Sequence, residues 1–176
     1  MNEIPAFNIR SYPPFRMARL YRAYVDHEAL YLIRLRGAIG YADAGSGFDP
    51  HPGRMVTGIF LRWWARTSLD AARRELDARG PREMLDAHRM NLRIAPGDVV
   101  ESRLDPPRLL GHGEHFACWS LTIRDRRPLS FQIEDEASFR TALEQLPLLL
   151  GSALSITVAW DETSRRPVRV HDAPQR

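Results

Sequence analysis

The chain has 176 residues, of which 44% are hydrophobic and 27% are charged, and these proportions are typical of a folded globular protein. They exclude a disordered or fibrous chain, and no apolar run reaches the roughly 18 residues that a membrane-spanning helix requires. Cys118 is the only cysteine, so an internal disulfide is excluded. The first fifteen residues carry acid and proline where a signal peptide would be basic and then apolar, so we expect a cytoplasmic protein.

All 25 basic residues are arginine, against 22 acidic residues, and the formal net charge is only +3. Arginine binds phosphate and carboxylate through two parallel hydrogen bonds, but a GC-rich genome would produce the same bias. Nucleic-acid-binding proteins gather positive charge on one face, whereas acidic residues alternate with arginine through most of this chain. The charge pattern therefore disfavours nucleic acid as a partner.

The first predicted elements are an arm and a β-hairpin. Three prolines predict an extended N-terminal arm over residues 1–16: Pro5, Pro13 and Pro14. Two runs of aliphatic and aromatic residues follow, Met17–Val25 and Ala29–Arg36, with Asp26, His27 and Glu28 between them. These runs predict two strands joined by a turn, with one face directed inward.

Five glycines and two prolines between residues 37 and 53 predict a loop. A helical-hairpin insertion is then predicted over residues 54–90. Its first helix has apolar residues within about half of a helical wheel, namely Met55, Val56, Ile59, Phe60, Trp63 and Trp64. This helix continues over Leu69–Arg79 and ends at Gly80 and Pro81, and a short second helix follows at Arg82–Arg89.

Strand patterns return in the second half of the chain. Leu92–Ala95 and Val99–Leu104 flank a turn at residues 96–98, and strict alternation within Phe116–Ile123 and Leu129–Ile133 predicts a second hairpin. One face of its first strand consists of Ala117, Trp119, Leu121 and Ile123, and the other of Cys118, Ser120 and Thr122.

A final helix is predicted to begin at the N-cap Asp135. One apolar stripe of this helix is expected to face the sheet: Phe139, Leu143, Leu146 and Leu150. Pro147 is expected to end or kink the helix near Leu146, because its ring clashes with the preceding turn. Leu154–Trp160 then reads as a strand, and residues 161–176 as a strand or tail in which Val168–Val170 pairs back.

This order of elements resembles a pleckstrin-homology-like (PH-like) barrel, in which antiparallel strands are closed at one end by a C-terminal helix. The resemblance is carried by the hairpin Ala18–Arg34, by Trp119–Ile123 and by Phe131–Glu136. The chain also looks like a group of uncharacterised bacterial proteins that share Asn91–Ile94, Leu146–Gly151 and Val158–Asp161.

The resemblance implies an α+β fold: an antiparallel PH-like barrel or strongly bent sheet, with a central helical-hairpin insertion and a C-terminal capping helix. It implies one domain over residues 17–160. It also implies a module that binds proteins, peptides or lipid headgroups without performing chemistry, so we expect no enzyme activity and no cofactor. Phosphoinositide-binding members carry basic residues at the first hairpin turn, and Asp26, His27 and Glu28 depart from that pattern.

Two side-chain groups are candidates for chemistry. His112, Glu114 and His115 lie within four residues and carry nitrogen and oxygen ligands that zinc accepts, but no third histidine or cysteine stands at a recognised spacing from them. We therefore interpret them as loop residues, with a small metal-dependent hydrolase as the third functional alternative. Cys118 falls within a predicted strand, where a small thiol is commonplace, and we assign it no catalytic role.

Two arginine-containing groups are candidate binding sites. Arg62, Trp63, Trp64 and Arg66 lie on the apolar helix of the insertion, in a stretch without acidic residues. They would contact a protein partner, a second copy of the chain or an anionic lipid surface.

Arg124, Arg126 and Arg127 at the tip of the second hairpin are a candidate anion site. The leading prediction is a non-catalytic, cytoplasmic binding or adaptor module that contacts a protein partner or itself. The alternative is a peripheral binder of anionic membrane through the Trp/Arg helix.

Overall fold

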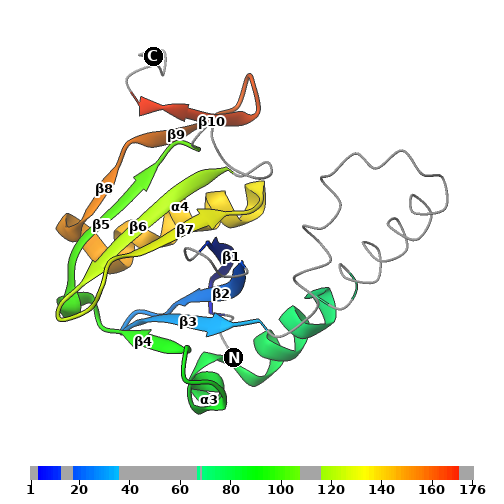
Figure 1. Cartoon of the computed structure of the whole chain (residues 1–176). Helices are drawn as coiled ribbons and strands as arrows, with labels where there is room; N and C mark the ends of the chain where they lie inside the picture. The colour runs from blue at the N-terminus through cyan, green and yellow to red at the C-terminus, as the bar shows by residue number, and fades with distance from the viewer. Residues whose placement is uncertain (1–3, 13–17, 36–66, 68, 108–115, 171–176) are drawn as a thin grey trace.

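The computed structural model describes residues 4–12, 18–35, 67, 69–107 and 116–170. Within these residues eight strands form one sheet in the order β4-β3-β2-β1-β7-β6-β5-β8, and β9 and β10 form a second sheet (Figure 1). Neighbours in the large sheet are antiparallel except β5 and β8, which are parallel. The strands are β1 (Ala6–Ser11), β2 (Arg19–Val25), β3 (Leu30–Arg34), β4 (Leu92–Ile94), β5 (Val99–Asp105), β6 (Ala117–Ile123), β7 (Leu129–Ile133), β8 (Leu154–Ile156), β9 (Val158–Asp161) and β10 (Arg166–Arg169).

Strand β1 joins the two halves of the large sheet, because it pairs with β2 on one side and with β7 on the other. Phe7 and Ile9 of β1 are completely buried in the main core, while Asn8 and Arg10 alternate with them. The structure differs here from the arm expected over residues 1–16. The alternation within Ala6–Ser11 builds a two-faced strand, and the three prolines lie outside it.

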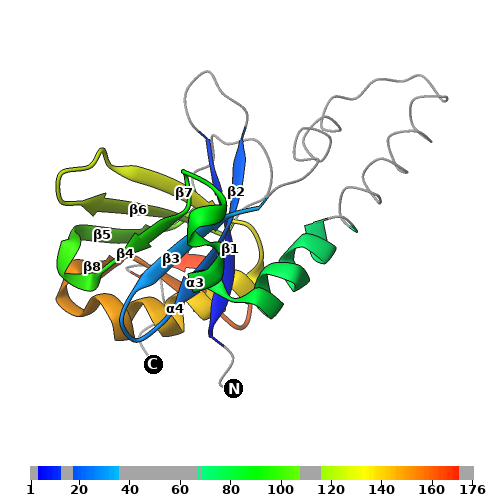
Figure 2. The same ribbon diagram turned by 90° about the horizontal axis from the view of Figure 1, so that it is seen from below.

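The large sheet curls strongly around helix α4 (Glu136–Leu150), as Figures 1 and 2 show from two directions. Asp135 caps this helix, since its Oδ1 accepts a hydrogen bond of 2.7 Å from the backbone N–H of Ser138. Phe139, Leu146 and Leu150 pack in one core with the inward side chains of the sheet. The α+β class, the strongly bent and mostly antiparallel sheet and the C-terminal helix are therefore confirmed.

Pro147 lies inside α4 and does not end it. The helix continues to Leu150, and the N–H of Gly151 donates to the carbonyl of Pro147. Of the expected end or kink near Leu146, the end is wrong, because burial of Leu146 and Leu150 offsets the loss of the hydrogen bond that proline cannot donate.

Strands β2 and β3 are buried on both faces. One face joins the main core, and the other packs against Leu69 and Leu76 of a helix over residues 69–79. The sequence predicted only one inward face for this hairpin. The helical insertion covers the second face, whose buried residues include Leu20, Tyr24, Tyr31, Ile33 and Leu35.

Gly80 turns the chain from the helix over residues 69–79 into α3 (Pro81–Met84), which continues as the 3-10 turn η1 (Leu85–Ala87). Its φ of 79° lies in the left-handed region that glycine tolerates best. The predicted stop at Gly80 and Pro81 is therefore confirmed. Two further 3-10 turns, η2 (Pro96–Asp98) and η3 (Gly151–Ala153), precede β5 and β8.

Candidate functional site

The candidate site, here called the groove, lies around Ile4 and Pro5, with residues of β2 and the insertion on one side and residues of the β2–β3 turn and α4 on the other. It consists of two cavities of about 530 Å³ and about 570 Å³ that share Ile4 and Pro5 in their walls. Volumes in this range are typical of ligand-binding clefts. The first cavity is lined by Ile4, Pro5, Ala6, Arg22, Tyr24, Asp77, Ala78, Arg79, Gly80 and Pro81, and the second by Ile4, Pro5, Val25, Asp26, His27, Gln145, Leu148 and Leu149.

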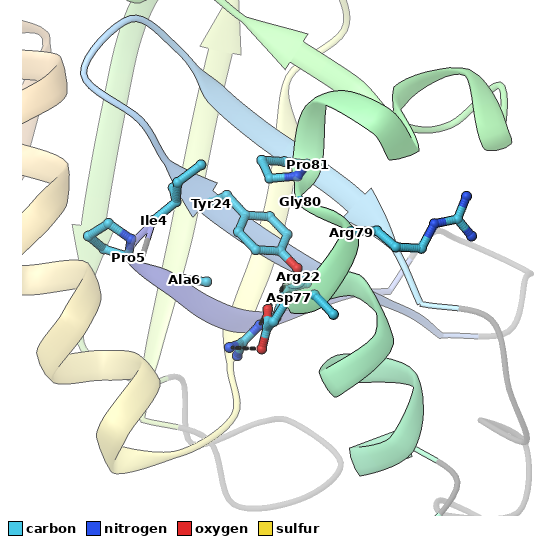
Figure 3. A pocket seen from close by; sticks show the side chains of 10 residues that line it. Ile4, Pro5, Ala6, Arg22, Tyr24, Asp77, Arg79, Gly80 and Pro81 are labelled. Atoms are coloured by element: carbon cyan, nitrogen blue, oxygen red, sulfur yellow. Dashed lines mark hydrogen bonds and ion pairs between the residues drawn. The ribbon is translucent and has the colours of Figure 1, made fainter. Parts of the chain in front are cut away.

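The polar end of the first cavity is formed by Arg22 and Tyr24 of β2 and by Asp77 of the insertion (Figure 3). The Arg22 guanidinium holds the Asp77 carboxylate with two hydrogen bonds, 3.1 Å from Nε to Oδ1 and 3.0 Å from Nη2 to Oδ2. The Tyr24 hydroxyl donates to the same Oδ1 at 2.8 Å. These groups therefore bind one another and fix the inserted helix on the sheet.

Burial of the Tyr24 hydroxyl raises its pKa well above the ordinary value near 10, and the hydrogen bond to Asp77 and the negative charge of Asp77 raise it further. Arg22 opposes this shift to a smaller extent. Tyr24 is therefore a neutral hydrogen-bond donor at neutral pH. Because its proton is committed to Asp77, it does not serve as an acid or base in this arrangement.

The polar network continues from the groove to the start of α4. Arg22 Nη1 donates to Asn8 Oδ1 at 3.0 Å, and Asn8 Nδ2 donates to Asp135 Oδ2 at 3.3 Å. The backbone N–H of Asn8 also donates to the Ser138 hydroxyl at 2.9 Å. Asn8 of β1 thus connects the ion pair at the groove to the N-cap of α4.

The β2–β3 turn borders the second cavity, and its charged residues are also paired. Arg82 of α3 donates to Asp26 at 2.9 Å and to Glu28 at 3.2 Å. Burial alone would raise the pKa of Asp26, but hydrogen bonds from Arg82 and His27 outweigh it and lower that pKa. The turn therefore presents to the groove an ion-paired edge in which the carboxylates of Asp26 and Glu28 share one guanidinium.

The α4 side of the second cavity carries an exposed apolar side chain. Leu148 is 79% exposed, the largest fraction among the exposed large hydrophobic side chains of the described residues. Leu149 and Gln145 lie beside it in the same cavity wall. The wall of the second cavity therefore combines one exposed leucine with polar and charged side chains.

The structure places Arg124, Arg126 and Arg127 at the tip of the β6–β7 hairpin, where all three are exposed. Arg124 Nη2 donates to the Gly97 carbonyl at 3.4 Å. No described residue forms an ion pair with Arg126 or Arg127. Asp125 adopts a φ of 58° between them, so the predicted turn is confirmed, while anion binding stays a prediction.

Several predicted site residues lie outside the described residues. They are the Trp/Arg group Arg62, Trp63, Trp64 and Arg66, and the histidine-rich group His112, Glu114 and His115. In the described ranges, no three His, Cys, Asp or Glu side chains gather where a metal ion would bind. Cys118 is described and lies half-buried on β6, as the alternation predicts.

Sequence reasoning did not find the groove, because its walls come from residues far apart in the chain. Ile4, Tyr24, Asp77 and Leu148 meet only after the sheet has curled and the insertion has docked. One local signal was present. Leu148 lies off the stripe of α4 that faces the sheet, so a helical wheel places a large aliphatic side chain on the outer surface.

A scan against models of known protein families finds no match for this chain, and a search of curated proteins finds none either. Within the part of the chain that the structure describes, no helix has both the length and the apolar character needed to cross a membrane. The fold and the groove define an α+β protein with a curled, mostly antiparallel sheet and two neighbouring surface cavities, one of which is lined by its C-terminal helix.

Proposed function

We propose that this chain is a non-catalytic binding module of PH-like architecture that holds a protein partner in the groove. The observation that carries the proposal is the position of Leu148, which is 79% exposed in the wall of a cavity of about 570 Å³. Burying such a side chain is worth roughly 1.5–3 kcal/mol, so a partner that covers it gains affinity there.

The topology supports the PH-like part of the proposal. In one half of the sheet the strands β1, β2, β3 and β4 are neighbours in chain order. In the other half β7, β6 and β5 are neighbours, and the pairing of β1 with β7 joins the two halves. Helix α4 lies along the inner side of this curled sheet. A sheet of antiparallel strands covered by a C-terminal helix is the arrangement that the sequence resemblance implies.

The polar groups of the groove support binding over catalysis. Arg22, Tyr24 and Asp77 satisfy one another at 2.8–3.1 Å. A catalytic acid, base or nucleophile must instead direct a reactive atom at the substrate. The groove therefore has a polar end whose groups bind one another and a wall that carries the exposed Leu148, and both features favour recognition over chemistry.

The test uses three forms of the chain as baits in cross-linking and affinity capture. They are the wild type, the variant Leu148→Glu and the matched control variant Val100→Glu. Val100 is 60% exposed and lines neither cavity. We expect a defined set of proteins to be captured by the wild type and by Val100→Glu, and to be lost from Leu148→Glu. Identical capture by all three folded baits would refute the groove as the binding surface.

A further inference from the structure

We infer that the groove binds a second copy of this chain, whose β6–β7 tip (residues 124–128) enters the second cavity beside Leu148. This inference rests on the proposed function and names the partner. The tip carries three arginine side chains, and carboxylates border the second cavity on both sides of Leu148. One chain therefore carries both halves of a contact between opposite charges.

The β6–β7 tip presents positive charge that the described residues leave unpaired. All five of its residues are exposed. The Arg124 guanidinium donates to a backbone carbonyl at 3.4 Å, and no described residue forms an ion pair or a side-chain hydrogen bond with Arg126 or Arg127. Asp125 offsets only one of the three positive charges. The tip is therefore able to bind carboxylates of another molecule.

Glu144 supplies one carboxylate next to Leu148. It precedes Leu148 by four residues on α4, so the two side chains lie on one face of the helix. Glu144 is exposed, and no described residue forms an ion pair with it. Its carboxylate is therefore open to a cation from outside the chain.

The β2–β3 turn supplies negative charge on the other side of the second cavity. Asp26 and Glu28 share the guanidinium of Arg82, at 2.9 Å and 3.2 Å, so two carboxylates face one cation. His27 contacts both carboxylates and offsets their charge only when it is protonated. The Glu28 side chain is 56% exposed, so its carboxylate is available to a second guanidinium.

An arginine side chain suits this combination of groups. Its aliphatic stem can cover Leu148, while its guanidinium binds a carboxylate through two parallel hydrogen bonds. Pro128 is exposed beside Arg127 and adds apolar surface to the tip. The tip is the turn of a hairpin and is convex, whereas the groove is concave. Charge, apolar contact and shape therefore favour the tip of a second copy as the occupant.

The test uses two charge-reversed variants of the full chain. The tip variant combines Arg126→Glu with Arg127→Glu, and the groove variant combines Glu28→Arg with Glu144→Arg. All four residues are exposed, so the substitutions leave the core unchanged. Either variant alone brings like charges together at the contact, whereas a mixture of the two variants pairs opposite charges in both directions.

Sedimentation velocity at low salt measures the association. We expect the wild type to self-associate, each charge-reversed variant alone to lose at least about tenfold in affinity, and the equimolar mixture to regain it. The matched control combines Arg89→Glu with Arg169→Glu, which are exposed arginines outside the tip and the groove, and it should associate like the wild type. Added salt should weaken the wild-type association, because it screens the charges.

Two results would overturn the inference. A mixture that associates as weakly as its separate components would contradict the contact between tip and groove. A wild type that stays monomeric would contradict a second copy as the occupant, and this includes a monomer that captures a different protein or floats with anionic vesicles through Leu148.

The result also separates this inference from the proposed function. If the chain is monomeric but its captured proteins depend on Leu148, the groove remains a binding surface and only the identity of its occupant is wrong. If the chain is monomeric and capture does not depend on Leu148, both proposals fail.

Discussion

Arg22 of β2 and Asp77 of the insertion form a bidentate ion pair between the sheet and the inserted helix. Its two hydrogen bonds measure 3.1 Å from Nε to Oδ1 and 3.0 Å from Nη2 to Oδ2. The Arg22 side chain is 18% exposed and that of Asp77 is 34% exposed, so the guanidinium is mostly buried and the carboxylate keeps partial contact with water. Charged pairs of this geometry are stronger than exposed single contacts. The pair both attaches the helix over residues 69–79 and forms one end of the groove.

Removing the carboxylate of Asp77 should destabilise the protein. In Asp77→Ala the Arg22 guanidinium loses two hydrogen bonds and the Tyr24 hydroxyl loses its acceptor. We expect a loss of about 1–3 kcal/mol in the free energy of unfolding, measured by urea denaturation. Asp70→Ala is the matched control, because the Asp70 side chain is 61% exposed. This substitution should change the free energy of unfolding by no more than about 0.5 kcal/mol. Equal losses for the two variants would contradict the role given to Asp77.

Tyr24 should make the protein less stable at alkaline pH. Its pKa is raised in the folded state, first by burial and then by Asp77, so the folded protein retains the proton more tightly than the unfolded chain does. The resulting stabilisation is complete below the unfolded pKa near 10 and is lost as the pH rises toward the folded pKa.

The measurement is the free energy of unfolding between pH 9 and pH 11. We expect Tyr24→Phe to flatten the decline with pH that the wild type shows, and the exposed Tyr12→Phe to leave that decline unchanged. A wild-type slope retained in Tyr24→Phe would show that Tyr24 is not the group responsible.

Substitution of Gly80 should destabilise the protein because of the backbone conformation at this residue and not because of crowding. A Cβ built on Gly80 meets no atom within 4 Å, but the φ of 79° is strained for any L side chain. We expect Gly80→Ala to lower the free energy of unfolding by about 1–3 kcal/mol. Gly97→Ala, where a Cβ also meets nothing and φ is not in the left-handed region, should cost much less. Similar costs at both positions would argue against strain at Gly80.

Replacing Pro147 should stabilise the chain. Alanine restores a backbone N–H for the carbonyl of Leu143, one turn earlier in α4, and removes the ring from the helix interior. We expect Pro147→Ala to raise the free energy of unfolding by about 1–3 kcal/mol in thermal or urea denaturation. Pro96→Ala is the control, since Pro96 starts the 3-10 turn η2 and interrupts no helix. A loss of stability in Pro147→Ala would mean that the packing of the ring outweighs the hydrogen bond.

The parts of the fold that the sequence predicts are those with local signals. Residues 117 to 123 alternate strictly between buried and outward positions, and Asp135 carries the N-cap signal of α4. Both predictions are confirmed. Strand β1 was missed although Phe7 and Ile9 alternate with polar residues, because the nearby prolines favoured an arm over a strand in the middle of the sheet.

The candidate site depends on contacts that no local pattern contains. The sequence does not specify that Asp77 reaches Arg22 and Tyr24, since 55 and 53 residues separate them. The presence of Leu148 and Pro5 in the walls of one cavity depends equally on the curl of the sheet around α4. A side chain off the core stripe of a helix indicates an outer surface, but only the assembled fold shows which cavity it borders.

The most direct test of the groove is a methyl NMR titration of the full chain with a peptide or protein that it has been shown to bind. The account predicts that the methyl signals of Ile4, Leu148 and Leu149 shift or broaden on addition of the ligand. The signals of Val100 and Val170, which line neither cavity, should stay in place. Perturbation concentrated on Val100 or Val170, with Ile4 and Leu148 unchanged, would contradict the proposal that the groove binds the partner.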